Sequence, residues 1–230
     1  DSLFEIPGTY PLLPEEVQPR IKLATDILED IVGHKVVSWR CPRLFGGTNV
    51  TNALEALGYE CDATYPMYFY NEQLFPYHPS QENWTEQGSL NLIEIIQFAD
   101  MGMESKDDYG RDKDQWPLYR TQSTEAFIPH IESFMSYLEK NDQSQKPIVL
   151  CFYFHPWEFW EMPEGVIHYG EGGVMPDPFL TKGCGKYCLN EVELLIDWLK
   201  SKDATFLTAG QCARKWKNIL AKPDIKRTQR

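Results

Sequence analysis

The sequence predicts an α/β fold, in which strands and helices alternate along the chain. Apolar residues recur at near-helical spacing in 14–32 and again in 124–140, whereas short apolar runs at 36–39, 92–96 and 147–155 have the length and composition of buried strands. Strands that alternate with helices usually pair in parallel. In such folds the chemistry lies at the carboxyl ends of the strands.

The first half of the chain is expected to contain two helices, two strands and a long loop. The helices are expected to end at Gly33 and Gly58, since glycine readily adopts the left-handed conformation that closes a helix. Long ordered loops are usually functional. The elements are a helix over 14–32, a strand over 36–39, a helix over 49–57, a strand over 59–63 and a loop over 65–88.

The second half continues the alternation. The strongest strand pattern in the chain lies at 147–155, and the segment 162–185 is rich in Gly and Pro and is expected to be a loop. The remaining elements are a strand over 92–96, an irregular segment over 103–117, a helix over 124–140, a helix over 189–200, a strand over 204–208 and a helix over 210–219.

Composition and charge narrow the class of protein. The 230 residues are 42% hydrophobic and 24% charged, which is typical of a globular chain, and we expect a single domain over 1–230. The net charge of −12 argues against nucleic acid as a partner, because phosphate contacts need clustered Lys and Arg. No apolar run is long enough to span a membrane, and the first residues lack a signal-peptide pattern. We expect a cytoplasmic protein.

Three of the predicted strands end on ionisable side chains, Arg40, Asp62 and His155, which are the candidate catalytic residues. A histidine at a strand end, followed by Pro156, is suited to acid or base chemistry near neutral pH. Each residue also has a structural interpretation: a satisfied core histidine, a structural ion pair for the arginine, and a turn or helix cap for the aspartate.

Two further carboxylates, Glu94 and Asp100, are candidates for substrate binding. Glu94 lies in the apolar strand 92–96, so it needs either a partner or a solvent-lined face, and an edge strand with this side chain in water is the alternative. The aromatic residues of the 65–88 loop have the chemistry to stack on sugar rings, although packing is the commoner use of such residues.

In order and spacing, the motifs resemble those of the NodB-type polysaccharide deacetylases, in the branch of peptidoglycan deacetylases and allantoinase-like amidohydrolases. Residues 40–42 resemble the Arg-x-Pro motif, and 51–65 resemble the helix-Gly-Tyr-x-x-Asp-x-Ser element. Residues 92–100 resemble the Glu-Ile-Pro…Asp segment, with Ile96 where proline is usual. Residues 154–158 resemble the His motif, and the tail from 191 to 213 resembles the closing helix-strand-helix.

This resemblance implies a distorted (β/α) barrel and a hydrolase that removes N-acetyl groups from a carbohydrate. In the family a divalent metal, commonly zinc, activates water, while an Asp acts as base. The resemblance further implies that His155 protonates the leaving nitrogen and that Arg40 holds the base. It implies that Asp62 positions one of these two, and that Tyr65 and Trp157 line the acyl or sugar pocket.

The sequence also departs from the family. The Asp-rich first motif and the His-x-x-x-His second motif are missing, so the metal ligands in this chain are unknown. Asp1 is a candidate for the last residue of the first motif. We therefore expect a truncated or degenerate homologue. The alternatives are an allantoinase-like enzyme acting on a small cyclic amide and a metal-free, inactive carbohydrate-binding protein. Members of the branch often assemble, so a homo-oligomer is a further expectation.

Overall fold

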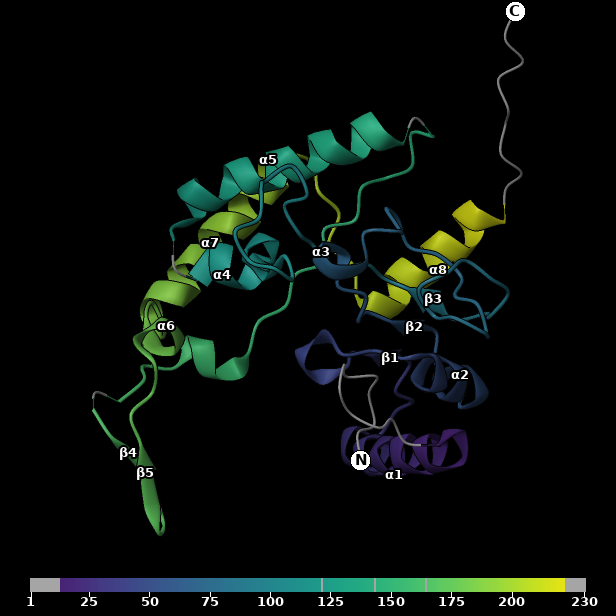
Figure 1. Ribbon diagram of the computed structural model, residues 1–230, viewed down its shortest axis with the longest axis horizontal. Helices are drawn as coiled ribbons and strands as arrows, with labels where there is room; N and C mark the ends of the chain where they lie inside the picture. The colour runs from purple at the N-terminus through teal and green to yellow at the C-terminus, as the bar shows by residue number, and fades with distance from the viewer. Residues whose placement is uncertain (1–12, 121, 143, 164, 222–230) are drawn as a thin grey trace, which may run out of the picture. The chain divides into compact units, whose positions relative to one another are not determined.

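The computed structural model describes residues 13–120, 122–142, 144–163 and 165–221 (Figure 1). The chain combines helices with small sheets, as expected for an α/β protein. It divides into two compact units, which are described separately. Unit 1 comprises 1–97, 146–151 and 207–230, and unit 2 comprises 98–145 and 152–206. Asp1, the candidate for the first family motif, lies outside the described residues, and the single domain over 1–230 stays a prediction.

Unit 1 is built on a three-stranded parallel sheet in the order β1-β2-β3. The register pairs Trp39 with Asp62, and Asp62 with Glu94. Helix α1 contacts α2, and α8 contacts β2 and β3 (Figure 1). The elements are α1 (Pro14–Val32), β1 (Ser38–Trp39), a 3-10 turn (Pro42–Leu44), α2 (Thr48–Ala56), β2 (Cys61–Asp62), α3 (Met67–Tyr70), β3 (Ile93–Glu94) and α8 (Ala209–Leu220).

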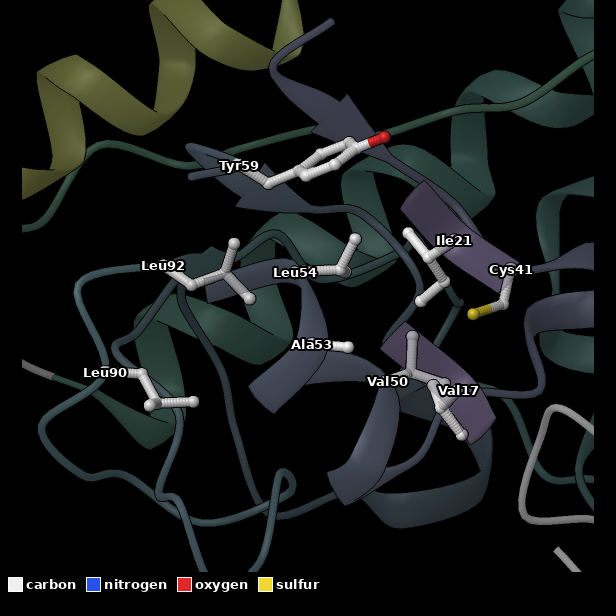
Figure 2. Packing of buried hydrophobic residues seen from close by; sticks show 9 residues of the cluster. All are labelled: Val17, Ile21, Cys41, Val50, Ala53, Leu54, Tyr59, Leu90 and Leu92. Atoms are coloured by element: carbon white, nitrogen blue, oxygen red, sulfur yellow. The ribbon is translucent and has the colours of Figure 1, made fainter. Parts of the chain in front are cut away.

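The core of unit 1 lies where α1 and α2 pack beside the segments around the sheet (Figure 2). Val17 and Ile21 come from one face of α1, because residues four apart lie on the same side of a helix. Thr25, one turn further on, shares a hydrogen bond of 2.6 Å with the Tyr59 hydroxyl. Gly33 ends α1 as predicted, with φ of 73° and its N–H donating to Glu29 O. The cluster consists of Val17, Ile21, Cys41, Val50, Ala53, Leu54, Tyr59, Leu90 and Leu92.

Unit 2 has an aromatic core. Phe98 lies edge-on to Phe127, Phe134 and Phe152, with ring centroids 5.1–5.4 Å apart. Two of these rings belong to α5, whose first turn is capped by Ser123. The elements are a 3-10 turn (Arg111–Lys113), α4 (Gln115–Arg120), α5 (Thr124–Asn141), the 3-10 turn η3 (Pro156–Phe159), β4 (Ile167–Tyr169), β5 (Gly172–Val174), α6 (Pro178–Thr181) and α7 (Lys186–Ser201).

Two predicted strands are wrong. In the described chain neither 147–155 nor 204–208 joins a sheet, although the last residue of each segment, His155 and Thr208, has extended backbone. A strand requires a partner ladder, and apolar composition alone does not supply one. The amide of Tyr153 donates instead to the side chain of Gln115, at 2.9 Å. Phe206 is 52% exposed rather than buried.

The predicted loops contain short elements that the sequence pattern did not indicate. Helix α3 lies in 65–88, α4 begins within 103–117, and the 162–185 segment holds the antiparallel hairpin β4–β5 together with α6. Each is too short to give a periodic signal. No helix in the described part of the chain is both long and apolar enough to cross a bilayer.

Candidate functional site

In unit 1 the sheet brings two carboxyl groups together in the interior. Asp62 and Glu94 are in register on neighbouring strands, and both are 0% exposed. Asp62 Oδ1 accepts the hydroxyl of Thr64. Glu94 Oε1 accepts the backbone N–H of Thr64 at 3.1 Å and that of Tyr65 at 2.8 Å. The second carboxyl oxygens, Asp62 Oδ2 and Glu94 Oε2, are buried and have no hydrogen-bond partner among the described residues.

This environment favours the protonated form of the pair. Burial raises the pKa of Asp62 from its ordinary value of 3.8 to about 7, despite the opposing effects of the Thr64 hydrogen bond and the Arg40 charge. Burial, followed by the charge of Asp62, raises the pKa of Glu94 well above its usual range. Two carboxylates this close cannot both ionise without a large cost. The pair therefore holds at least one proton in mildly acidic solution.

Arg40 lies between the sheet and the segment 146–151. Its Nε donates to Ala63 O at 2.8 Å, and its Nη2 donates to Cys151 Sγ at 3.2 Å. Gln97 Nε2 also donates to Cys151 Sγ, at 3.3 Å. Arg40 thus contacts the residue that follows Asp62, as expected for residues at neighbouring strand ends, and its charge lowers the pKa of both Asp62 and Glu94.

The side chains of Glu94 and Tyr65 are both buried in the interior of unit 1. The water-facing alternative for Glu94 is wrong, because Glu94 is 0% exposed, and the backbone of Tyr77 also pairs with that of Glu94. Tyr65 is 0% exposed, and its hydroxyl accepts the N–H groups of Glu72 at 3.1 Å and Gln73 at 3.2 Å. Burial raises the pKa of this hydroxyl to about 12. A function for either residue in substrate binding stays a prediction.

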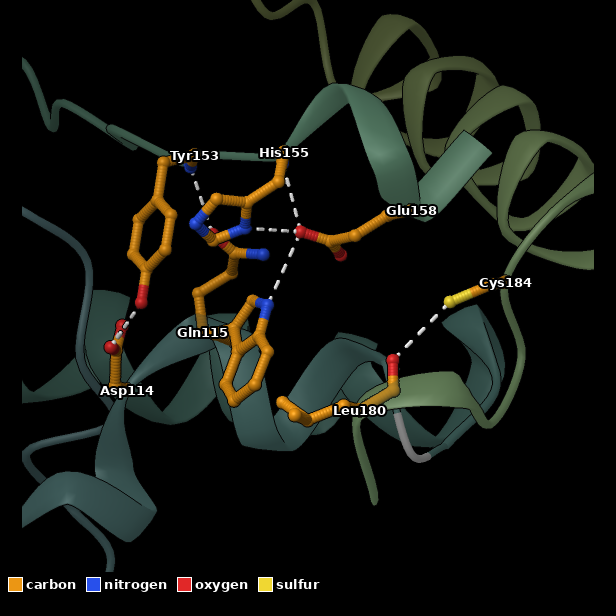
Figure 3. A network of polar contacts seen from close by, with 8 residues as sticks. Asp114, Gln115, Tyr153, His155, Glu158, Leu180 and Cys184 are labelled. Atoms are coloured by element: carbon orange, nitrogen blue, oxygen red, sulfur yellow. Dashed lines mark hydrogen bonds and ion pairs between the residues drawn. The ribbon is translucent and has the colours of Figure 1, made fainter. Parts of the chain in front are cut away.

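In unit 2 the imidazole of His155 is held by Glu158 (Figure 3). His155 Nδ1 lies 2.6 Å from Glu158 Oε1, and the same oxygen accepts the backbone N–H of His155 at 2.8 Å. The indole Nε1 of Trp116 donates to it as well, at 3.2 Å. The Glu158 side chain is 0% exposed, whereas that of His155 is 45% exposed. The result is an oriented imidazole with one edge in solvent.

Aromatic rings surround His155. The indole of Trp157 stacks on it at 5.3 Å with an interplanar angle of 26°. Tyr153 lies edge-on at 5.9 Å and Trp116 edge-on at 6.2 Å. The Tyr153 hydroxyl donates to Asp114 Oδ2 at 2.6 Å. Trp157 thus lies beside the candidate catalytic histidine, and its function as a pocket residue stays a prediction.

Asp100 makes its contacts with helix α5. Its Oδ2 is 2.7 Å from His130 Nδ1, and its Oδ1 accepts the Ser133 hydroxyl at 2.6 Å and the Gly102 N–H at 3.1 Å. A side chain on Gly102 would place its Cβ 2.3 Å from Ser133 Oγ, so the backbone here is close to the helix. The carboxylate of Asp100 thus links the segment after β3 to α5 through hydrogen bonds. A function of Asp100 in substrate binding stays a prediction.

The predicted site residues therefore fall into two groups. Arg40, Asp62, Tyr65 and Glu94 lie in unit 1, and His155, Trp157 and Asp100 lie in unit 2. Glu158 was not among the predicted site residues, although it is the partner of His155; the resemblance implied that Asp62 positions either His155 or Arg40. The spacing His-Pro-x-Glu was the signal that could have found it. When Pro occupies the first position of a turn and Glu the third, the Glu carboxylate often accepts a hydrogen bond from the backbone N–H of the residue before the turn.

The described residues do not provide the metal site that the resemblance implies. Nowhere in 13–120, 122–142, 144–163 and 165–221 do three His, Cys, Asp or Glu side chains converge as metal ligands. The six cysteines are free thiols. Zinc needs at least three protein ligands in its usual catalytic sites, and the described residues do not fit it.

Comparison with protein-family models, with curated proteins and with solved structures finds no match to this chain. The class that the described residues define is accordingly a mixed helix-and-sheet protein with a carboxylate-bound histidine in unit 2 and a buried carboxyl pair in unit 1.

Proposed function

We propose that this chain is a hydrolase of the polysaccharide deacetylase type, which removes N-acetyl groups from a carbohydrate. The parallel sheet of unit 1 would then be part of a distorted (β/α) barrel. The motif resemblance supports both proposals. The expectation that identical subunits assemble rests on the same resemblance.

One observation carries the catalytic part of the proposal. His155 is held by a fully buried carboxylate, stacks on Trp157 and leaves 45% of its side chain exposed. A histidine that is merely satisfied in a core would not keep a solvent-facing edge. Indole faces suit the apolar faces of sugar rings, so the surroundings of His155 are compatible with a carbohydrate.

His155 would act by protonating the leaving nitrogen. As the bond between the acyl carbon and nitrogen breaks, its electron pair stays on nitrogen, which takes the proton from the imidazolium. The resemblance gives Arg40, in unit 1, the part of holding the carboxylate that acts as base. The resemblance implies that zinc would supply an activated water, whereas the described residues do not fit a zinc site.

The proposal is tested by acetate release. The protein, expressed from its natural reading frame, is incubated with N-acetylated oligosaccharides and peptidoglycan fragments in the presence of zinc chloride. His155→Gln should lower turnover by ~10²–10⁴-fold, as expected for loss of a general acid. His168→Gln is the matched control, because His168 is an exposed histidine in the hairpin of the same unit.

Turnover by His155→Gln close to that of the wild type would remove His155 from the mechanism. If the wild type releases no acetate from any of these substrates, the deacetylase proposal is wrong. Opening of a small cyclic amide without acetate release would instead support the allantoinase-like alternative.

A further inference from the structure

We propose that Glu158 is a positioning residue that keeps the proton of neutral His155 on Nδ1 and thereby leaves Nε2 as a bare acceptor. The evidence is the set of donors on one oxygen. Glu158 Oε1 accepts the backbone N–H of His155 at 2.8 Å and the indole N–H of Trp116 at 3.2 Å, and it lies 2.6 Å from His155 Nδ1.

The two flanking groups fix the role of this oxygen. Backbone and indole N–H groups are donors only, so both require an acceptor at Oε1. An oxygen that already receives two donors is best suited by an ionised carboxylate, which accepts and does not donate. The short contact with Nδ1 then requires that Nδ1 carries the proton. A neutral imidazole has only one N–H, so the proton is absent from Nε2.

The surrounding backbone holds Glu158 in place. Pro156 starts the 3-10 turn η3, the Glu158 N–H donates to His155 O at 3.0 Å, and Gly185 N–H donates to Glu158 O at 2.8 Å. A Cβ on Gly185 would lie 2.6 Å from Glu161 Cγ, so the chain at Gly185 passes close to the segment that follows η3. Figure 3 shows the second ring nitrogen of His155 pointing away from Glu158.

The chemical consequence rests on the proposed function. Neutral His155 presents a lone pair at Nε2, so it must first take up a proton there before it can act as an acid. The imidazolium that forms has Glu158 as its counter-charge. When Nε2 gives its proton to the leaving nitrogen, His155 returns to the form with the proton on Nδ1. Because Glu158 keeps a proton on Nδ1, His155 both takes up and releases its second proton at Nε2.

The tautomer can be measured without any activity. Long-range ¹H–¹⁵N correlation spectra of ¹⁵N-histidine-labelled protein, recorded in mildly alkaline solution, distinguish a proton on Nδ1 from one on Nε2. We expect His155 of the wild type to carry it on Nδ1. Glu158→Met, which has a similar volume but no acceptor, should lose this signal and move toward the Nε2–H form that unconstrained histidine prefers. Glu158→Gln retains an acceptor oxygen and should keep Nδ1–H.

His130 is an internal control, because its Nδ1 lies 2.7 Å from Asp100 Oδ2 in the same unit. Its signals should be unchanged in both variants. If the His130 signals change in Glu158→Met, the fold of that variant is disturbed. The inference is then judged by whether His155 carries its proton on Nδ1 in the wild type and in Glu158→Gln. A wild type with the proton on Nε2, or a correctly folded Glu158→Met that keeps Nδ1–H, would overturn the inference. Absence of acetate release with Nδ1–H present would refute only the proposed function.

Discussion

The buried pair Asp62 and Glu94 makes the stability of unit 1 depend on pH in a direction opposite to that of most carboxylates. A carboxyl group whose pKa is higher in the folded than in the unfolded protein binds more protons when folded. For Asp62 the values are about 7 and 3.8. The stabilisation is complete below pH 3.8 and is lost as the pH rises through 7. The difference corresponds to about 4 kcal/mol, at about 1.4 kcal/mol per pH unit.

Asp62→Asn removes this titration while keeping the shape of the protonated side chain. Its stability should match that of the wild type near the lower of these two pKa values and exceed it by up to about 4 kcal/mol in mildly alkaline solution. Loss of the Asp62 charge also removes one of the effects that raise the pKa of Glu94. The assay is hydrogen exchange of peptides that cover 59–65 and 92–97, corrected for intrinsic exchange rates, across this pH range.

Asp26→Asn is the matched control, because Asp26 is an exposed aspartate of α1 in the same unit, paired with Lys22 at 2.6 Å. The difference between this variant and the wild type should stay small at every pH, as for exposed ion pairs in general. The reasoning is refuted if Asp62→Asn destabilises the protein more in alkaline than in acidic solution.

Two further predictions concern packing and the Asp100 contacts. In urea titrations, Leu54→Ala should lower the free energy of unfolding by ~2–5 kcal/mol, because Leu54 is 0% exposed. The control Leu23→Ala, at a site that is 63% exposed, should change this free energy by less than about 0.5 kcal/mol. Asp100→Asn should cost ~1–3 kcal/mol, because its oxygens accept two α5 side chains. Faster hydrogen exchange of 98–103 and of α5 would show this, and unchanged exchange would contradict it.

The sequence predicted the long helices well and the sheet poorly. The bounds of α1 were correct because a regular apolar face and a terminal glycine both mark them. The ladders of β1, β2 and β3 comprise only two residues each, and pairing depends on partners that are distant in sequence. For the same reason, the apolar run at 147–155 had the composition of a strand without a neighbour to pair with.

The candidate site shows the same limit. Residue type and strand position singled out Arg40, Asp62 and His155, and the structure puts Arg40 near Asp62 as expected. It could not be predicted that Glu94 would be buried beside Asp62, because this depends on the register of β2 and β3. The strand pattern does not single out Glu158 either, because its contact with His155 depends on a local turn.

Aromatic side chains pack against one another within the segment 65–88, and this matters to anyone who modifies the protein. The Tyr65 ring lies 5.4–5.9 Å from those of Tyr70, Tyr77 and Trp84. The Tyr77 hydroxyl donates to Trp84 O at 2.7 Å. A connection anchored in this way is a poor place for an affinity tag, a fluorescent insertion or new chain ends, even though its sequence has the composition of a loop.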